Sequence, residues 1–224
     1  MAGTIRAVIF DFDGTLTELT LDFRFLREEI VKVALDYVDP SLIKEFEGQY
    51  ILEMIQEIEA RSEERGAAFK AEAYRRLRDL ELEGARGKDV YPYTREVLAQ
   101  LKGRGARTGI VTRSCIEVLN EVFPDMAVYV DAVVTRDDID RVKPHPSHAE
   151  AALALLGVPA ESAMLVGDHP TDILTGKAIS MVTVGVLTGR TRREQFVDVG
   201  ATYVFDDIRE VLPLVGDTGK PLFP

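Results

Sequence analysis

Short apolar runs rich in β-branched residues recur along this 224-residue chain, and they constrain its fold more than any other feature. They are RAVIF (residues 6–10), TGIV (108–111), AVV (132–134), AMLV (163–166) and VTVGV (182–186). Apolar runs of this length without polar alternation are typical of parallel strands buried on both faces. Helical stretches separate them, and this alternation predicts an α/β fold: a doubly wound, Rossmann-like parallel sheet with helices on both faces.

Capping residues predict the boundaries of helices between these strands. We expect Thr94 and Ser147 to be N-caps, and the helix after Ser147 to end at Gly157. Pro170 fits the first turn of a further helix, which Gly176 is expected to weaken or end.

The segment from about residue 17 to residue 86 shows no such strand. Its apolar side chains recur at steps of three and four residues, which predicts three amphipathic helices. These helices are expected over residues 23–37, over 39–58 with Asp39 as N-cap and Pro40 in the first turn, and over 69–80. We therefore expect two domains: an α/β core of residues 1–16 and 87–224, and a helical cap of residues 17–86 over the strand ends.

Composition and charge exclude several classes of protein. Hydrophobic residues make up 46% of the chain, yet no apolar run approaches the roughly 18 residues of a membrane-spanning helix. The formal net charge of −11 opposes binding to nucleic acid or to an anionic membrane surface. The single cysteine, Cys115, is expected to be a core residue, and the N-terminal sequence lacks a secretory signal. We expect a cytoplasmic protein, monomeric or homodimeric.

Two aspartates follow the first predicted strand directly, in the segment Asp11-Phe12-Asp13-Gly14-Thr15. Open α/β sheets bind ligands beyond the carboxyl ends of their strands, and side-chain alternation puts Asp11 and Asp13 on the same side. Carboxylates this close repel each other unless a cation or a proton lies between them, so the pair indicates a divalent metal. Gly14 permits an unusual backbone angle and lets an anion approach the amide groups.

Later strand ends supply further polar groups. Thr112 follows the second strand, Lys143 opens the Lys-Pro-His-Pro stretch after the third, and Asp168 and Asp172 follow the fourth. The spacing of the last two lets a loop-to-helix turn present both carboxylates to one ion. Mg²⁺, which prefers oxygen ligands, is the expected occupant. Lys143 supplies the cation that an acidic chain needs to hold an anionic substrate.

Other candidate side chains are tied less directly to chemistry. His145, His148 and His169 have no spacing typical of zinc ligands, so we expect loop or capping roles for them. His169 lies between the two metal-site aspartates and is a candidate to line the pocket. Arg113, directly after Thr112, is either a substrate contact or a surface charge.

The order of these motifs, DFDGT, a strand followed by Thr112, Lys143-Pro144 and GDHPTD, resembles the haloacid dehalogenase superfamily of aspartate-nucleophile hydrolases. The match spans residues 8–172, and segments 181–189 and 200–212 are similar to the C-terminal strands of its phosphoglycolate phosphatase-like branch. The insertion resembles the helical cap of that branch. The resemblance implies a Mg²⁺-dependent phosphatase that hydrolyses a small phosphorylated metabolite, phosphoglycolate-like or a sugar phosphate, through an aspartyl-phosphate.

The resemblance also implies catalytic roles. Asp11 would attack phosphorus, and Asp13 would protonate the leaving alcohol and then deprotonate the hydrolytic water. Lys143 would neutralise charge on the phosphoryl group, to which Thr112 would donate a hydrogen bond.

Metal and phosphate ligands are implied in the same way. The implied metal ligands are Asp11, the backbone carbonyl of Asp13, Asp168 and, directly or through water, Asp172. The implied phosphate-binding residues are Thr112 and Lys143, with the backbone amides of Gly14 and Arg113 as supports.

Several alternatives share some of these residues. A phosphomutase keeps all four motifs, so only product analysis separates it from a phosphatase. A dehalogenase is disfavoured because Asp13 has no alkoxide to protonate when a halide leaves. A phosphorylation-controlled receiver module is shorter and uncapped, and carries its acidic pair and its phosphorylated aspartate on different strands. A catalytically silent binding protein is disfavoured by the complete set of acid, metal-binding and cationic residues.

Overall fold

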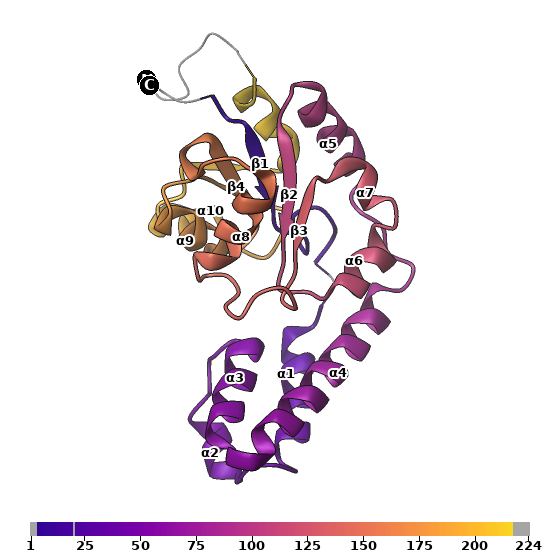
Figure 1. The fold of residues 1–224 in the computed structure, drawn as a ribbon, viewed down its shortest axis with the longest axis vertical. Coiled ribbons are helices and arrows are strands. Elements are labelled where there is room, and N and C mark those ends of the chain that lie inside the picture. Colours follow the sequence, from indigo (N-terminus) through magenta and orange to yellow (C-terminus); the bar gives the residue numbers. More distant parts are fainter. Residues whose placement is uncertain (1–3, 20, 217–224) are drawn as a thin grey trace. The chain divides into compact units, whose positions relative to one another are not determined.

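A computed structural model gives the structure of residues 4–19 and 21–216 (Figure 1). Its strands are β1 (Ala7–Phe10), β2 (Arg107–Val111), β3 (Ala132–Val134), β4 (Ala163–Gly167), β5 (Val182–Val186) and β6 (Tyr203–Phe205). They form one sheet in the order β3-β2-β1-β4-β5-β6, with every neighbouring pair parallel. The chain thus winds outward from β1 in one direction and then in the other, which confirms the predicted doubly wound α/β fold.

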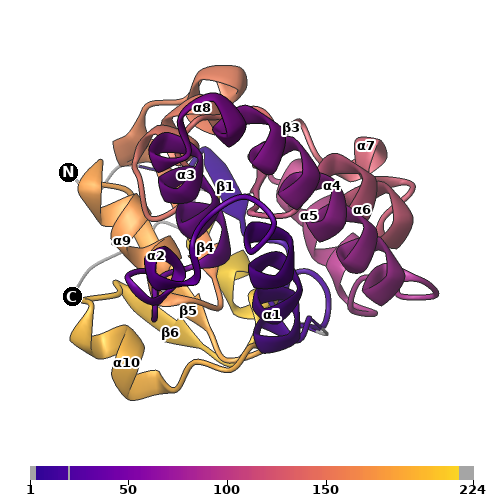
Figure 2. The same ribbon diagram turned by 90° about the horizontal axis from the view of Figure 1, so that it is seen from below.

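The helices within residues 94–198 flank this sheet (Figure 2). The α-helices are α1 (Phe23–Ala34), α2 (Pro40–Lys44), α3 (Ile51–Arg61), α4 (Gly66–Ala85), α5 (Thr94–Gly103), α6 (Ile116–Val122), α7 (Met126–Tyr129), α8 (Ser147–Leu156), α9 (Pro170–Ala178) and α10 (Arg193–Asp198). Short 3₁₀ segments are η1 (Glu63–Arg65), η2 (Ala160–Ser162) and η3 (Ile208–Leu214). Among the described residues, no helix combines the length and the apolar character needed to cross a membrane.

The central strand is buried on both faces. Ala7 and Ile9 of β1 belong to a core cluster with residues of α8, including Ala152. Val8 and Phe10, whose side chains point the opposite way, are also fully buried. Because protein covers both faces, a polar side chain is accommodated only where the strand ends, and the first residue beyond it is Asp11.

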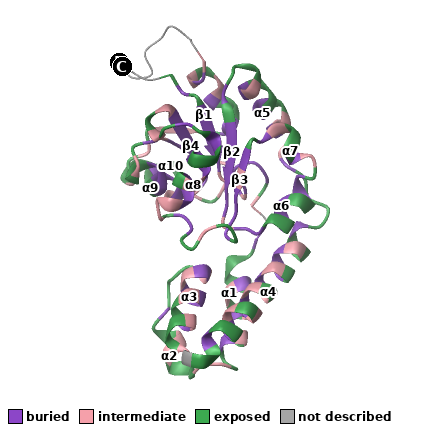
Figure 3. Ribbon diagram, viewed as in Figure 1, coloured by how far each residue is buried: buried purple, intermediate pink, exposed green. Residues whose placement is uncertain are grey.

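The chain divides into two compact units (Figure 3). The core unit comprises Met1–Leu19 and Gly87–Pro224, and the helical unit comprises Thr20–Arg86. Within the helical unit, α4 packs against both α1 and α3. The Tyr37 ring lies 5.6 Å from that of Phe69, and the Tyr37 hydroxyl donates to Glu72 at 2.6 Å.

The second predicted helix of the helical unit is wrong in one respect, because two helices, α2 and α3, replace it. Asp39 and Pro40 do occupy the predicted N-cap and first-turn positions of α2. Between the helices Gly48 has φ +85°, a left-handed conformation that favours glycine. Phe46 stays buried across this break, so the apolar period continues although the backbone is not helical. Periodicity alone could not reveal the interruption.

Two predicted N-caps are also wrong. Thr94 and Ser147 are the first residues of α5 and α8 rather than their caps. The buried Thr94 hydroxyl instead donates to the Leu16 carbonyl at 2.8 Å. The predicted end of α8 at Gly157, which has φ +64°, and the predicted place of Pro170 in the first turn of α9 are both confirmed.

Gly176 does not end α9, which continues to Ala178. A Cβ atom at Gly176 would lie 2.6 Å from Thr183 Cγ2 on β5, too close for ordinary packing. The glycine therefore allows α9 to pack closely against the sheet, so its role is tertiary rather than local.

Candidate active site

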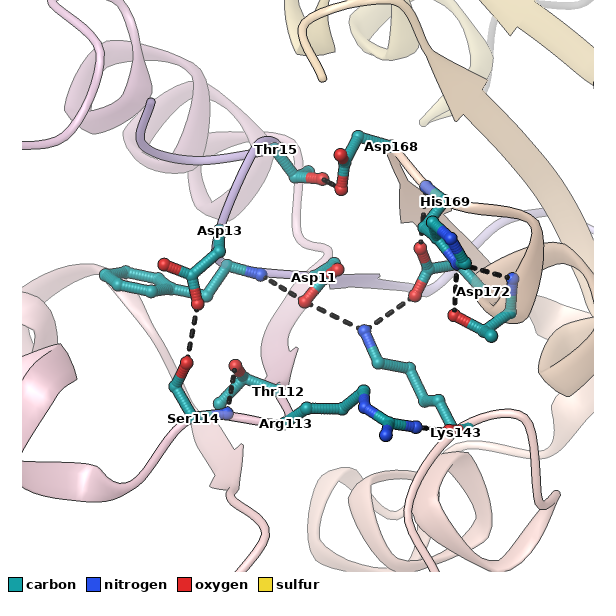
Figure 4. Close-up of polar contacts among 12 residues, drawn as sticks. Asp11, Asp13, Thr15, Thr112, Arg113, Ser114, Lys143, Asp168, His169 and Asp172 are labelled. Atoms are coloured by element: carbon teal, nitrogen blue, oxygen red, sulfur yellow. Dashed lines mark hydrogen bonds and ion pairs between the residues drawn. The ribbon is translucent and has the colours of Figure 1, made fainter. Parts of the chain in front are cut away.

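The polar residues that the sequence places at separate strand ends come together in one region (Figure 4). Backbone pairing that continues past the strands sets their positions. The Asp11 amide donates to Val166 O of β4 at 2.8 Å, and the Thr112 amide donates to Val134 O of β3 at 3.1 Å. Each of these polar residues is thus the next residue in a parallel ladder, and the carboxyl edge of the sheet holds it in place.

Lys143 lies between two carboxylates. Its Nζ is 2.8 Å from Asp11 Oδ1 and 2.6 Å from Asp172 Oδ1, and its side chain is 1% exposed. Burial alone would lower the pKa of Lys143, but the charges of Asp11 and Asp172 outweigh it and raise that pKa. Lys143 therefore remains a cation in contact with the predicted nucleophile.

Three aspartates form an acidic cluster, Asp11, Asp168 and Asp172, in which one carboxylate oxygen of each lies within 4.8 Å of the others. Burial and then the neighbouring carboxylates raise the pKa of Asp168 to about 8. Burial also raises the pKa of Asp11 to about 6, although Lys143 opposes the shift. Buried carboxyl oxygens that repel one another in this way fit a small divalent cation such as Mg²⁺.

Asp168 and Asp172 of the acidic cluster differ in their hydrogen bonds. Asp172 Oδ1 accepts from Lys143, and its Oδ2 accepts from the His169 amide at 3.1 Å. Asp168 Oδ1 accepts a longer bond of 3.4 Å from the Thr15 hydroxyl. Asp172 is therefore fixed mainly by protein donors, whereas Asp168 is more available to an ion.

Glycines make room for these carboxyl groups. A Cβ atom at Gly14 or at Gly189 would collide with the Asp168 carboxyl group, and one at Gly167 would collide with that of Asp172. Gly14 also has φ +82°, which favours glycine at this turn. Its amide donates to Thr17 O at 2.9 Å, and the use of that amide for phosphate stays a prediction. Gly14 serves the site by making space for Asp168.

The Asp13 side chain lies in a partly buried environment separate from the acidic cluster. The Ser114 hydroxyl donates to Asp13 Oδ2 at 2.6 Å, and the Ser114 amide donates to Thr112 Oγ1 at 3.1 Å. Burial raises the pKa of Asp13 to about 6, an effect that the Ser114 hydrogen bond opposes. The Asp13 side chain is outside the acidic cluster, and the contribution of its backbone carbonyl to a metal site remains a prediction.

Arg113 and His169 support the loops around the site. Arg113 Nη1 donates to Lys143 O at 2.5 Å, which places its guanidinium against the Lys143 loop. The His169 side chain accepts from the Thr171 amide at the start of α9, as expected for a capping residue.

The side chains of the predicted site residues lie in this region (Figure 4), but sequence reasoning missed Ser114 and Gly189. Ser114 follows Thr112 by two residues, which is the spacing at which a threonine hydroxyl accepts from a backbone amide in a turn. This spacing could have indicated that Ser114 lies beside Thr112 in the site. Gly189 follows β5, so its position beyond the next strand end could have indicated it. Cys115 is buried, as expected of a core residue.

Comparison with known proteins gives consistent matches. A family model described as haloacid dehalogenase-like hydrolase matches residues 5–180. A phosphoglycolate phosphatase from Rhodospirillum rubrum is 32% identical over 216 residues, which cover 90% of this chain and 87% of that protein. The pyrophosphatase PpaX from Oceanobacillus iheyensis is 24% identical over 218 residues, which cover 96% of this chain and 99% of that protein.

Solved structures show the same fold. A β-phosphoglucomutase from Clostridium difficile, 21% identical, has a TM-score of 0.65 over 92% of this chain and 93% of that chain. A hydrolase from Pseudomonas syringae, 22% identical, has a TM-score of 0.65 over 92% of this chain and 96% of that chain.

The fold and the site together define an α/β hydrolase with an acidic centre at the carboxyl edge of its sheet. The chain belongs to the haloacid dehalogenase-like hydrolase family. The predicted family and the prediction of a hydrolytic enzyme are thereby confirmed, and the predicted phosphatase class agrees with the names of the curated relatives.

Proposed function

We propose that this enzyme is a Mg²⁺-dependent phosphatase that hydrolyses a small phosphomonoester through a phosphorylated Asp11. The contact of Asp11 with the buried Lys143 ammonium, next to two further carboxylates, carries the proposal. This grouping of side chains combines a nucleophile, a cation for the phosphoryl group and oxygen ligands for a metal. Relatives named phosphoglycolate phosphatase and pyrophosphatase PpaX support a small phosphorylated substrate.

In the first half-reaction an Asp11 oxygen forms a bond to phosphorus while the bond from phosphorus to the alcohol oxygen breaks. Asp13 donates its proton to the departing alkoxide, and its raised pKa suits it to carry that proton. In the second half-reaction Asp13 takes a proton from water, whose oxygen then attacks phosphorus. Inorganic phosphate leaves, and the Asp11 carboxylate and the Asp13 acid are regenerated.

Two groups of this chain stabilise the transferring phosphoryl group. Lys143 places a fixed positive charge beside Asp11 in a site with little water. Thr112 Oγ1 accepts from the Ser114 amide, so its hydroxyl proton is directed to another acceptor, and we assign a phosphoryl oxygen to that place.

The metal site belongs to the same proposal. Asp11, Asp168 and the backbone carbonyl of Asp13 would hold Mg²⁺, with Asp172 contributing directly or through water. When bound, the ion supplies positive charge that offsets the carboxylates and the phosphoryl oxygens.

Asp168 should contribute more to Mg²⁺ binding than Asp172, because protein donors engage both oxygens of Asp172. In calorimetric titrations with MgCl₂, we expect Asp172→Asn to weaken binding by about 10- to 100-fold, the range of outer-sphere partners, and Asp168→Asn to weaken it further. Asp131→Asn is the control, because Asp131 binds the Thr108 amide near the amino end of β2. A larger loss for Asp172→Asn would reverse these assignments.

Asp11→Asn should abolish turnover and leave the fold intact, because an amide of similar shape cannot attack phosphorus. With Mg²⁺ and a panel of small phosphate esters, wild-type protein should release inorganic phosphate, and the variant should lose at least about 10³-fold in kcat. Circular dichroism checks the fold. Transfer of phosphate within the substrate, without its release, would indicate a phosphomutase. Near wild-type phosphate release by a folded Asp11→Asn protein would remove covalent catalysis.

We also propose that the helical unit is a cap that selects substrates by size. Both of its connections emerge beside the site: Thr17 forms bridges with Asp13 and with Val90, and the Thr17 hydroxyl donates to Asp89 O at 2.9 Å. An inserted helical unit that closes over a site excludes water from the reaction and admits small substrates.

The paired connections allow a clean test of the cap. In the core unit, a short Gly/Ser linker joining Leu19 to Gly87 should preserve the bridge between Thr17 and Val90. We expect this protein to hydrolyse p-nitrophenyl phosphate slowly and to lose its ranking among metabolite esters. The same deletion carrying Asp11→Asn controls for contaminating phosphatase. An unchanged substrate ranking in the deletion protein would exclude a gating role.

A further inference from the structure

We propose that His148 is a positioning residue that fixes the backbone of Lys143 to the end of β3 and thereby directs the Lys143 ammonium at Asp11. The inference rests on the proposed function, in which Lys143 acts on the phosphoryl group. It assigns a role to a histidine for which the sequence indicated only a loop or capping position.

The two ring nitrogens of His148 have distinct partners. The Lys143 amide donates to Nδ1 at 3.1 Å, so Nδ1 carries no proton and the neutral ring must carry it on Nε2. Nε2 lies 3.1 Å from Val134 O, and a carbonyl only accepts, so Nε2 donates to it. The imidazole therefore joins the loop that carries Lys143 to the last residue of β3.

The same carbonyl connects His148 to the other phosphate-binding residue. Val134 O also accepts from the Thr112 amide at 3.1 Å. The backbones of Lys143 and Thr112 are thus joined through one imidazole and one carbonyl. Both residues are assigned to the phosphoryl group, so this link fixes the separation of two catalytic groups whose positions in the sequence are far apart.

The surroundings of His148 keep it in this state. The side chain is fully buried at the second position of α8. Burial and then the charge of Lys143 lower the pKa of His148 to about 3; the contact with Val134 O opposes the shift, Arg113 adds to it, and Asp138 opposes it. A protonated ring would present an N–H to the Lys143 amide, and the link would be lost. A neutral ring of one tautomer is what a rigid connection requires.

The two contacts can be separated by substitution. The Asn amide ends near the place of Nδ1, so His148→Asn can keep an acceptor for the Lys143 amide and loses the contact with Val134. The Gln amide ends near the place of Nε2, so His148→Gln can keep the contact with Val134 and loses the one with Lys143. Each variant gives up one buried hydrogen bond, and Val134 O keeps the Thr112 amide in both.

Because the link needs both contacts, we expect each variant to lose about 10- to 100-fold in kcat on p-nitrophenyl phosphate, as a small misplacement of a catalytic group can cost. The melting temperature should fall more in His148→Gln, because this variant leaves the buried Lys143 amide without its acceptor. An unchanged kcat in either folded variant would overturn the inference.

A double-mutant cycle shows whether His148 acts through Lys143. In a Lys143→Ala background, His148→Gln should cause little further loss of kcat/KM, because the group that it positions is already gone. Losses that multiply would indicate a purely structural residue and would contradict the proposal. If Lys143→Ala alone keeps full activity, the proposed function fails instead, so the two failures are distinguishable.

Nuclear magnetic resonance of the wild-type imidazoles gives a test that needs no variant. The chain has only three histidines, and His148 should show the neutral tautomer protonated at Nε2. Adding inorganic phosphate, the reaction product, should shift the Nδ1 resonance of His148 because the ion contacts Lys143. A ring protonated at Nδ1, or an Nδ1 resonance unmoved by saturating phosphate, would contradict the link.

Discussion

Three charged side chains at the carboxyl edge of the sheet are held together almost without water, and the rest of the site depends on this contact. Lys143 Nζ touches both Asp11 and Asp172, and its side chain is 1% exposed. Buried ion pairs are stable only when further hydrogen bonds satisfy the remaining donors and acceptors. The His169 amide donates a hydrogen bond to the Asp172 carboxylate, and the Phe12 amide donates one to Asp11 Oδ1 at 2.6 Å. The turn after β1 and the start of α9 are therefore as much a part of the site as the charges.

Parallel topology explains how distant residues reach this contact. The strand order places β1 between β2 and β4, so the residues that follow these strands emerge side by side. Close packing then limits which residues can surround them, because Gly14, Gly167 and Gly189 leave no space for a Cβ atom. In this strongly acidic chain, three carboxylates are therefore close together and the buried Lys143 lies between two of them. This arrangement suits the binding of a divalent cation together with an anionic substrate.

The sequence predicted what depends on local pattern and missed what depends on contacts across the fold. Apolar runs located the strands, and the residues following them located the site, because a buried parallel strand excludes charged side chains except at its end. The gap between α2 and α3 was not predicted because Phe46 keeps the apolar period through it. Ser114 was missed because its partner, Asp13, is 101 residues away in the chain. The role of His148 was likewise hidden, since the carbonyl that it binds belongs to β3.

The central claim is that phosphate passes through Asp11, and trapping that intermediate tests it most directly. In Asp13→Asn protein mixed with Mg²⁺ and p-nitrophenyl phosphate, the first step needs little acid assistance, whereas the second lacks its base. We expect a burst of p-nitrophenol near one equivalent per enzyme. Mass spectrometry of the acid-quenched, digested protein should then find the phosphate on Asp11. A burst of that size with phosphate on another residue, or with no phosphorylated peptide, would contradict the account.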